Sequence, residues 1–253
     1  MRSSNDRTIH ADMRHRTDLG ATGTSRTTTP NGSSMTIART IPAYAMTAVA
    51  GWIDAIGILL FFQDLRIFPT YMSGNTTRLF VSVVQEDLQR ARLYGAAIVL
   101  FVFGAVIGRW INDGTRWRET IAVLFEAALL FAAALAASRG APQVLTLGLL
   151  AFAMGWNNVA LKSRRGVGPK GYITGTLVAF ASAVADALAH RGRWSEAVEP
   201  AVVWSSLACG ALAGAFSTTL MSAAFVLLVP SSVVALCGVI VAVGWLRDGA
   251  DGS

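Results

Sequence analysis

The sequence predicts an all-α membrane protein. We expect a bundle of six spanning helices and two short re-entrant or broken helices, arranged as two inverted repeats. The 253-residue chain is 53% apolar and only 14% charged, whereas soluble domains are about 25% charged. Long apolar runs recur along the chain, and several motifs occur twice in the same order. Such a shortage of charge indicates that most of the surface faces lipid.

The first 38 residues form a polar tail that is rich in Ser, Thr and Arg and poor in large apolar side chains. This composition is typical of disorder. The tail lacks the apolar core and the cleavage site of a signal peptide. Because the first apolar run follows Met35 closely, translation from Met35 instead of Met1 is left open.

Six stretches are long enough for the helix of about 20 residues that crosses a bilayer. We expect the turn between the last two spans at Ser217, Thr218 and Thr219. Pro230 is expected to kink the sixth span. The stretches are residues 43–62, 93–110, 120–138 and 141–161, and the uncharged run 200–246, which is long enough for two crossings.

Two shorter apolar segments, residues 70–84 and 172–185, have a different length. Each has about 15 residues, or roughly 22 Å as a helix, and is too short for a hydrocarbon core about 30 Å thick. Each begins with a polar turn that contains glycine. Short, glycine-interrupted segments at matching positions of two halves indicate a transport site.

Three motifs of the first half recur in the second half at offsets of 104, 101 and 106 residues. This register predicts a duplication, with one repeat at residues 40–140 and the other at 141–246. The glycine pairs of the third motif have the spacing that brings membrane helices close together, so we expect packing between spans rather than dimer contacts. The pairs are Gly51-Trp52-Ile53-Asp54 with Gly155-Trp156-Asn157-Asn158, Tyr71-Met72-Ser73-Gly74-Asn75-Thr76 with Tyr172-Ile173-Thr174-Gly175-Thr176, and Gly104/Gly108 with Gly210/Gly214.

The distribution of basic residues favours six spans over eight. With a cytoplasmic N-terminus, six spans leave ten basic residues in inner segments and five in outer ones, whereas eight spans leave six inside and eight outside. The positive-inside rule therefore predicts six spans, with both termini on the cytoplasmic side of a bacterial inner membrane. Three spans per half is an odd number, so the halves must be inverted. The ten are Arg109, Arg116, Arg118, Lys162, Arg164, Arg165, Lys170, Arg191, Arg193 and Arg247.

The same motifs resemble those of the YoaK-type bacterial membrane proteins, the domain-of-unknown-function family 1275. The resemblance rests on residues 51–55, 72–76 and 173–177 and extends over about residues 40–246. Members of that family usually have threonine where this chain has Ser73, a change that keeps the hydroxyl. The resemblance implies a membrane fold and no particular substrate, because the family has none established.

Asp54 lies near the middle of the first predicted span, where a carboxylate is costly unless it is paired or protonated. We interpret it as a proton or cation site, and its alternative role is as a structural partner of Arg78 or of a backbone group. Its counterpart Asn158 cannot titrate. For Arg78 itself, a salt bridge with Asp54 is favoured over contact with an anionic substrate.

The two polar turns supply further candidate ligands, because a helix start presents N–H donors and a partial positive charge. The alternative is that these side chains only cap their own helices. An ionised Asp54 nearby would repel anions and favours a cation, a proton-coupled solute or a zwitterion. The predicted substrate- or ion-binding residues are Asp54, Ser73, Gly74, Asn75, Thr76, Asn157, Asn158, Thr174, Gly175 and Thr176, and Trp52, Trp156, Tyr71 and Tyr172 are predicted to line the cavity.

Glu126, a second acid inside a predicted span, is interpreted as a structural or lipid-interface residue. It lies about seven residues into the stretch 120–138, near enough to the end for its side chain to extend to the interface.

The function predicted from these features is secondary transport of a small solute, proton-coupled or not. The alternative is a non-transporting scaffold or regulator of a partner protein. We expect no enzyme, because no nucleophile–base pair, acid dyad or HExxH motif is present. No metal or cofactor is expected, since Cys209 and Cys237 are far apart and the three histidines lie outside the apolar runs. The expected partners are the lipid bilayer and an unknown solute, with no nucleic acid. A homo-oligomer, the coupling ion and the direction of transport are left open.

Overall fold

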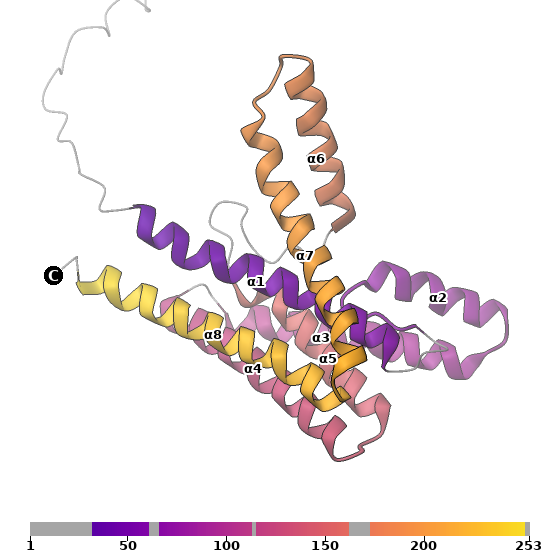
Figure 1. Ribbon diagram of the computed structural model, residues 1–253. Coiled ribbons are helices and arrows are strands. Elements are labelled where there is room, and N and C mark those ends of the chain that lie inside the picture. The colour runs from indigo at the N-terminus through magenta and orange to yellow at the C-terminus, as the bar shows by residue number, and fades with distance from the viewer. Residues whose placement is uncertain (1–31, 61–65, 113–114, 162–172, 251–253) are drawn as a thin grey trace, which may run out of the picture. The chain divides into compact units, whose positions relative to one another are not determined.

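The computed structural model describes residues 32–60, 66–112, 115–161 and 173–250, and all regular elements in these ranges are helices (Figure 1). The predicted all-α membrane bundle is confirmed. The predicted tail lies outside the described residues up to position 31, as do Tyr172 and the four basic residues between positions 162 and 170. The helices are α1 (Gly32–Leu59), α2 (Met72–Val84), α3 (Leu88–Ile111), α4 (Arg116–Ser138), α5 (Gln143–Ala160), α6 (Ile173–Leu188), α7 (Ser195–Leu220) and α8 (Ala223–Ala250).

Five of these helices, α1, α3, α4, α7 and α8, have a segment that is long and apolar enough to cross a bilayer. The fourth predicted span corresponds to α5, which has only 18 residues and contains Asn157 and Asn158 near its end. The two amides lower the hydropathy of an already short helix. The chain is therefore a multi-pass membrane protein, and its sixth crossing stays a prediction.

Two predicted boundaries differ from the structure. α1 begins at Gly32, inside the segment predicted to be disordered. The predicted turn at Ser217, Thr218 and Thr219 is wrong, because α7 continues to Leu220. The three hydroxyls donate to the carbonyl oxygens three residues earlier, at 2.7 Å each. Polar side chains that satisfy helix carbonyls in this way stay inside a helix instead of ending it.

The main apolar core lies among α1, α4, α5 and α8. Two close helix crossings flank it, α3 against α5 and α1 against α7. A Cβ added at Gly104 would collide with the carbonyl of Phe152, and one added at Gly210 with the carbonyl of Ala48. The prediction that these glycines pack spans against each other is confirmed, because only a residue without a side chain fits such an approach.

The contacts between helices are the same when the two halves of the chain are exchanged. When α1, α2, α3 and α4 are exchanged with α5, α6, α7 and α8 in that order, every pair of helices in contact maps onto a pair that is also in contact. For example, α1 with α7 becomes α5 with α3, α2 with α3 becomes α6 with α7, and α4 with α8 maps onto itself. Two related halves would produce this pattern.

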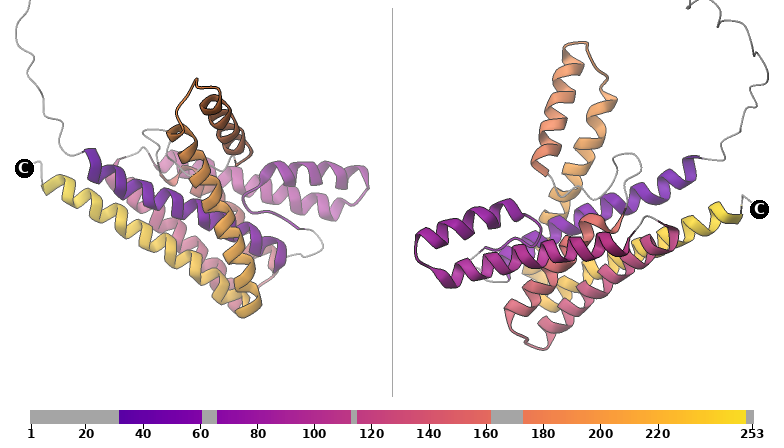
Figure 2. Two further views of the ribbon diagram at one scale, coloured as in Figure 1. Left: turned by 45° about the horizontal axis from the view of Figure 1, so that its top comes forward. Right: turned by 180° about the vertical axis from the view of Figure 1, so that it is seen from behind.

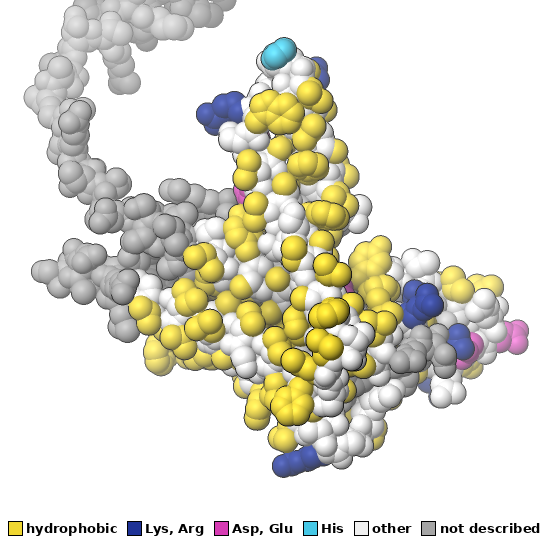
Figure 3. Space-filling view, in the orientation of Figure 1, with side chains coloured by type: hydrophobic (Ala, Val, Ile, Leu, Met, Phe, Trp, Pro, Cys, Tyr) yellow, Lys and Arg dark blue, Asp and Glu magenta, His cyan; other side chains and the backbone are white. Residues whose placement is uncertain are grey.

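The short helices α2 and α6 occupy equivalent places, each packed along the following helix, α3 or α7, as a hairpin (Figure 2). Few of their side chains are buried: Asn75 and Ser82 in α2, and Thr176 and Ala187 in α6. Their outer faces are largely apolar, as on α2 with Phe80 and Val84. Figure 3 shows apolar side chains spread over the visible face, with few charged ones among them. This is the surface expected of helices in lipid.

Candidate functional site

The first turns of α2 and α6 converge on two adjacent cavities. One, of about 600 Å³, lies beside Asp54, and the other, of about 990 Å³, lies beside Asn158. The two cavities share four lining residues: Thr70, Tyr71, Ile173 and Thr174. Segments about a hundred residues apart in the sequence therefore line the same space.

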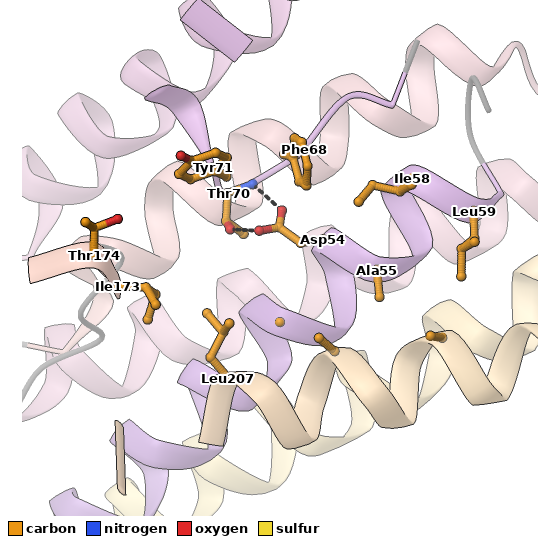
Figure 4. A pocket seen from close by; sticks show the side chains of 13 residues that line it. Asp54, Ala55, Ile58, Leu59, Phe68, Thr70, Tyr71, Ile173, Thr174 and Leu207 are labelled. Atoms are coloured by element: carbon orange, nitrogen blue, oxygen red, sulfur yellow. Dashed lines mark hydrogen bonds between the residues drawn. The ribbon is translucent and has the colours of Figure 1, made fainter. Parts of the chain in front are cut away.

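Asp54 projects from α1 toward the segment that precedes α2 (Figure 4). One carboxylate oxygen accepts a hydrogen bond from the backbone N–H of Thr70 at 2.8 Å, and the other accepts one from the Thr70 hydroxyl. A carboxylate has about four acceptor positions, so this pairing leaves room for a ligand. Asp54 is half-buried and lines the smaller cavity, with Ile173 and Thr174 of α6 on the facing wall.

The segment 66–70 is fixed by Asn75. The Asn75 amide nitrogen donates to the carbonyl of Phe68 at 2.6 Å, and its oxygen accepts from the backbone N–H of Phe68 at 3.2 Å. Ile67 is fully buried in a second apolar cluster with residues of α3 and α5. These contacts hold Thr70 in front of Asp54, so Asn75 shapes the wall of the cavity instead of facing its interior.

Arg78 does not form the predicted salt bridge with Asp54. Its guanidinium donates to the carbonyl of Arg66 at 2.9 Å and lies 5.4 Å above the ring of Phe68. Arg78 therefore contacts the same segment 66–70 that Asn75 holds. The alternative that Asp54 binds a backbone group agrees with the structure, since Thr70 is its partner.

The start of α2 has no side-chain cap. Tyr71 occupies the N-cap position without a capping hydrogen bond from its side chain. The hydroxyls of Thr76 and Thr77 donate backward, to the carbonyls of Met72 and Ser73. The alternative that the polar side chains only cap their own helix therefore does not describe α2, whose positive end faces the larger cavity through Met72 and Ser73.

Several predicted site residues lie together around the cavities. The described residues of this group that line one cavity or both are Asp54, Tyr71, Ser73, Asn158, Thr174, Gly175 and Thr176. The sequence pattern selected them because they are polar or glycine residues at matching places of the two halves.

Other predicted residues have structural contacts instead. A Cβ at Gly74 would collide with the ring of Tyr71, and the Thr76 hydroxyl is bound within its own helix. The indoles of Trp52 and Trp156 donate to the carbonyls of Val226 and Ala122 at 3.0 and 2.8 Å. Neither tryptophan lines the cavities beside Asp54 and Asn158.

The sequence interpretation missed three polar residues that line the cavities: Thr70, Glu196 and Glu199. Thr70 is the first residue of the predicted short segment 70–84, and this position at the start of a polar turn could have identified it as a site residue. Glu196 and Glu199 are in the first turns of α7, which begins at Ser195, earlier than the predicted span. The charged residues among the described lining of the two cavities are Asp54, Glu196 and Glu199, all acidic.

Asn157 and Glu126 form a separate polar contact in the core. The Asn157 amide donates to Glu126 Oε1 at 2.5 Å, and both side chains are buried. Of the two roles expected for Glu126, structural or lipid-interface, the complete burial of its side chain contradicts the lipid-interface one. α4 begins at Arg116 and not at Thr120, so Glu126 lies near the middle of the helix.

We expect Thr70→Val to weaken the fold around Asp54, because it removes the hydroxyl donor and keeps the shape of the side chain. Hydrogen bonds between membrane helices average about 0.6 kcal/mol, and those to charged groups about 1.5–3 kcal/mol. A loss of about 1–2 kcal/mol is therefore expected in the free energy of unfolding, measured in detergent by denaturant titration.

Thr77→Val is the matched control, since its hydroxyl is exposed and bonded within α2. Its effect should stay within about 0.5 kcal/mol. Equal stability of the Thr70 variant and the parent would contradict the assigned role of the Thr70 hydroxyl.

Comparison with known proteins gives a family and one curated relative. Residues 43–241 match the family described as "Protein of unknown function (DUF1275)". The chain is similar to a UPF0700 transmembrane protein of Rhizobium meliloti (strain 1021), with 35% identity over 179 residues, which covers 68% of this chain and 72% of the relative. No solved structure matches the chain.

Proposed function

Because the chain belongs to the DUF1275 family of membrane proteins, whose description assigns no function, we propose a function from the geometry of its own site. The protein is a small secondary transporter, and its solute binds in the cavities where α2 and α6 begin beside Asp54. It acts in a bacterial inner membrane with both termini cytoplasmic, as the distribution of basic residues favours.

One observation carries this proposal: two short helices from different halves of the chain begin at one pair of cavities that also exposes a carboxylate of a membrane helix. Discontinuous helices whose N-termini point at a central site are a recurring design of secondary transporters. Intramembrane carboxylates that face a cavity typically belong to substrate or ion pathways.

The exchange of helix pairs between the two halves supports alternating access. If two related halves can adopt each other's packing, the protein has two states of similar energy that expose the central site to opposite sides. The close crossings of α3 with α5 and of α1 with α7 are equivalent under this exchange. They are the contacts that would rearrange between the states.

The charges of the described residues that line the cavities favour a small cation or a zwitterion. Asp54, Glu196 and Glu199 are acidic, and Glu196 is only weakly paired with Arg193, at 3.8 Å. An amino group would bind the free acceptor positions of Asp54. A carboxylate on the same solute would face the uncapped start of α2.

A panel of solutes in proteoliposomes tests the function, with uptake or current as the readout. The panel contains primary and quaternary amines, amino acids and simple organic anions of similar size. We expect signals with some cations or zwitterions and none with the anions. Asp54→Asn should lower the rate at least about tenfold, the effect of losing about 1.4 kcal/mol of interaction with the solute.

Asp186→Asn is the matched control, because it removes the same charge from the far end of α6, where Asp186 is half exposed and pairs with Arg191. It should transport at the parent's rate. Transport of anions would contradict the proposed site, and so would an Asp54→Asn variant that transports at the parent's rate at every pH. A complete absence of transport would favour the alternative, a membrane scaffold or regulator of a partner protein.

A further inference from the structure

A second carboxyl group lies in the core, away from the cavities. Glu126 is fully buried near the middle of α4, and it is not among the residues that line the cavities beside Asp54 and Asn158. Its oxygen Oε1 accepts from Asn157 of α5 at 2.5 Å. Its other oxygen, Oε2, is buried and has no hydrogen-bond partner among the residues that the structure describes.

Within the described part of the chain, no positive charge compensates Glu126. α4 packs against α5 and α8, and lightly against α3. From α5 the Asn157 amide donates to Glu126, and from α8 the thiol of Cys237 is the titratable group that interacts with it electrostatically. Among the described residues, α3 contributes no charged partner to Glu126, and the described ion pairs do not include Glu126.

The carboxyl groups of Asp54 and Glu126 therefore differ in their hydrogen-bond partners. Asp54 receives one donor on each oxygen, from Thr70, and faces a cavity. Glu126 receives one neutral donor on Oε1, and among the described residues none donates to its other oxygen. An ionised carboxylate needs donors or a cation to replace its hydration, and Asp54 meets this need better than Glu126 does. For Glu126 the neutral acid is favoured, with its proton on Oε2.

We propose that Glu126 is a proton-binding site of this protein and holds its proton in the conformation described. The proton comes from water and returns to water, with no other bond formed or broken. Since Glu126 does not line the cavities, exchange of its proton requires α4 to separate from α5 or α8. That the proton drives solute movement rests on the proposed function, whereas the protonation of Glu126 does not.

The sequence of α5 links this site to the cavities. Asn157 donates to Glu126, and the next residue, Asn158, lines the larger cavity. A shift of α5 that follows contact between a solute and Asn158 would also move Asn157 away from Glu126. Asp54 is then the solute-binding acid and Glu126 the proton-binding acid, which changes the sequence-based expectation that a moving proton would use Asp54.

Infrared spectroscopy of the purified protein in lipid tests the protonation directly. A protonated carboxyl gives a carbonyl stretch that is separate from the bands of carboxylates and amides. We expect this band at neutral pH in the parent, its loss in Glu126→Gln and its retention in Asp54→Asn. Glutamine imitates the neutral acid in shape and can still accept from Asn157, so the Gln variant should fold.

Asn157→Leu provides a second readout that a purely structural glutamate would not give. Because it removes the single donor to the carbonyl, the band should persist and move to higher frequency. The proposal is overturned if the parent lacks the band, if Asp54→Asn abolishes it, or if Asn157→Leu leaves its frequency unchanged. Since no solute is involved, a positive result together with a failed transport assay would contradict the transporter role alone.

Discussion

Gly104→Ala is expected to separate α3 from α5 and to lower stability strongly. The added methyl group would collide with the carbonyl of Phe152 on the facing helix. A backbone carbonyl cannot rotate away as a side chain does, so one helix must move. Overpacking of this kind typically costs about 1–3 kcal/mol, and we expect the upper end of that range. Thermal unfolding in detergent, followed by circular dichroism, measures the effect.

Gly95→Ala, on the same helix, is the control. A Cβ there would meet only the end of Leu79, at 4.0 Å. Because alanine favours a helix over glycine by up to about 1 kcal/mol, this variant should be as stable as the parent or more stable. Gly210→Ala, which meets the carbonyl of Ala48 at the equivalent crossing, should behave like Gly104→Ala. A Gly104 variant that unfolds at the parent's temperature would contradict the close crossing.

The parts of the fold that sequence predicts well are those encoded locally. Apolar runs define most of the long helices, and the four-residue spacing within the pairs Gly104/Gly108 and Gly210/Gly214 identifies the contacts where backbones meet. The short helices α2 and α6 were predicted within a few residues of their observed bounds, because their length and polar starts are local features. Of the residues that the repeated motifs singled out, some, such as Ser73 and Thr174, line the cavities beside Asp54 and Asn158, and others, such as Asn75, do not.

The parts that sequence did not predict depend on how one helix is placed against another. The contact of Glu126 with Asn157 requires the register of α4 against α5, which no single segment contains. The start of α4 was placed too late because Trp117, Arg118 and Glu119 interrupt the apolar pattern, although they belong to the helix. Likewise, the turn after α7 was placed on hydroxyl residues that in fact bond to helix carbonyls.

Asn75 shows why a polar residue in a motif can be important without binding a ligand. Its side-chain amide donates a hydrogen bond to the carbonyl of Phe68 and accepts one from the N–H of Phe68. The Asn75 side chain is completely buried. Its position in the other half is taken by Thr176, which lines the larger cavity. The two halves thus use the same position differently, which the alignment of their motifs alone does not reveal.

Asn75→Leu is accordingly expected to release the segment 66–70 and to remove Thr70 from Asp54. The N–H and C=O of Phe68 would both lose their partners, at about 1–3 kcal/mol each, so a total of about 2–4 kcal/mol is expected for this part-buried site. Hydrogen exchange measured by mass spectrometry should rise in peptides covering residues 66–80, and the unfolding midpoint should fall.

Thr76→Val, at the next position, is the control for Asn75→Leu, because its hydroxyl is exposed and bonded within α2. It should change neither hydrogen exchange nor the midpoint. If Asn75→Leu left the hydrogen exchange of residues 66–80 at the parent's level, the two hydrogen bonds between Asn75 and Phe68 would not be what holds Thr70 in place. The wall of the cavity would then depend on Ile67 and on the contact of Pro69 with Gly57 of α1. Because Asp54 has Thr70 as its partner, the same variant should also weaken solute binding.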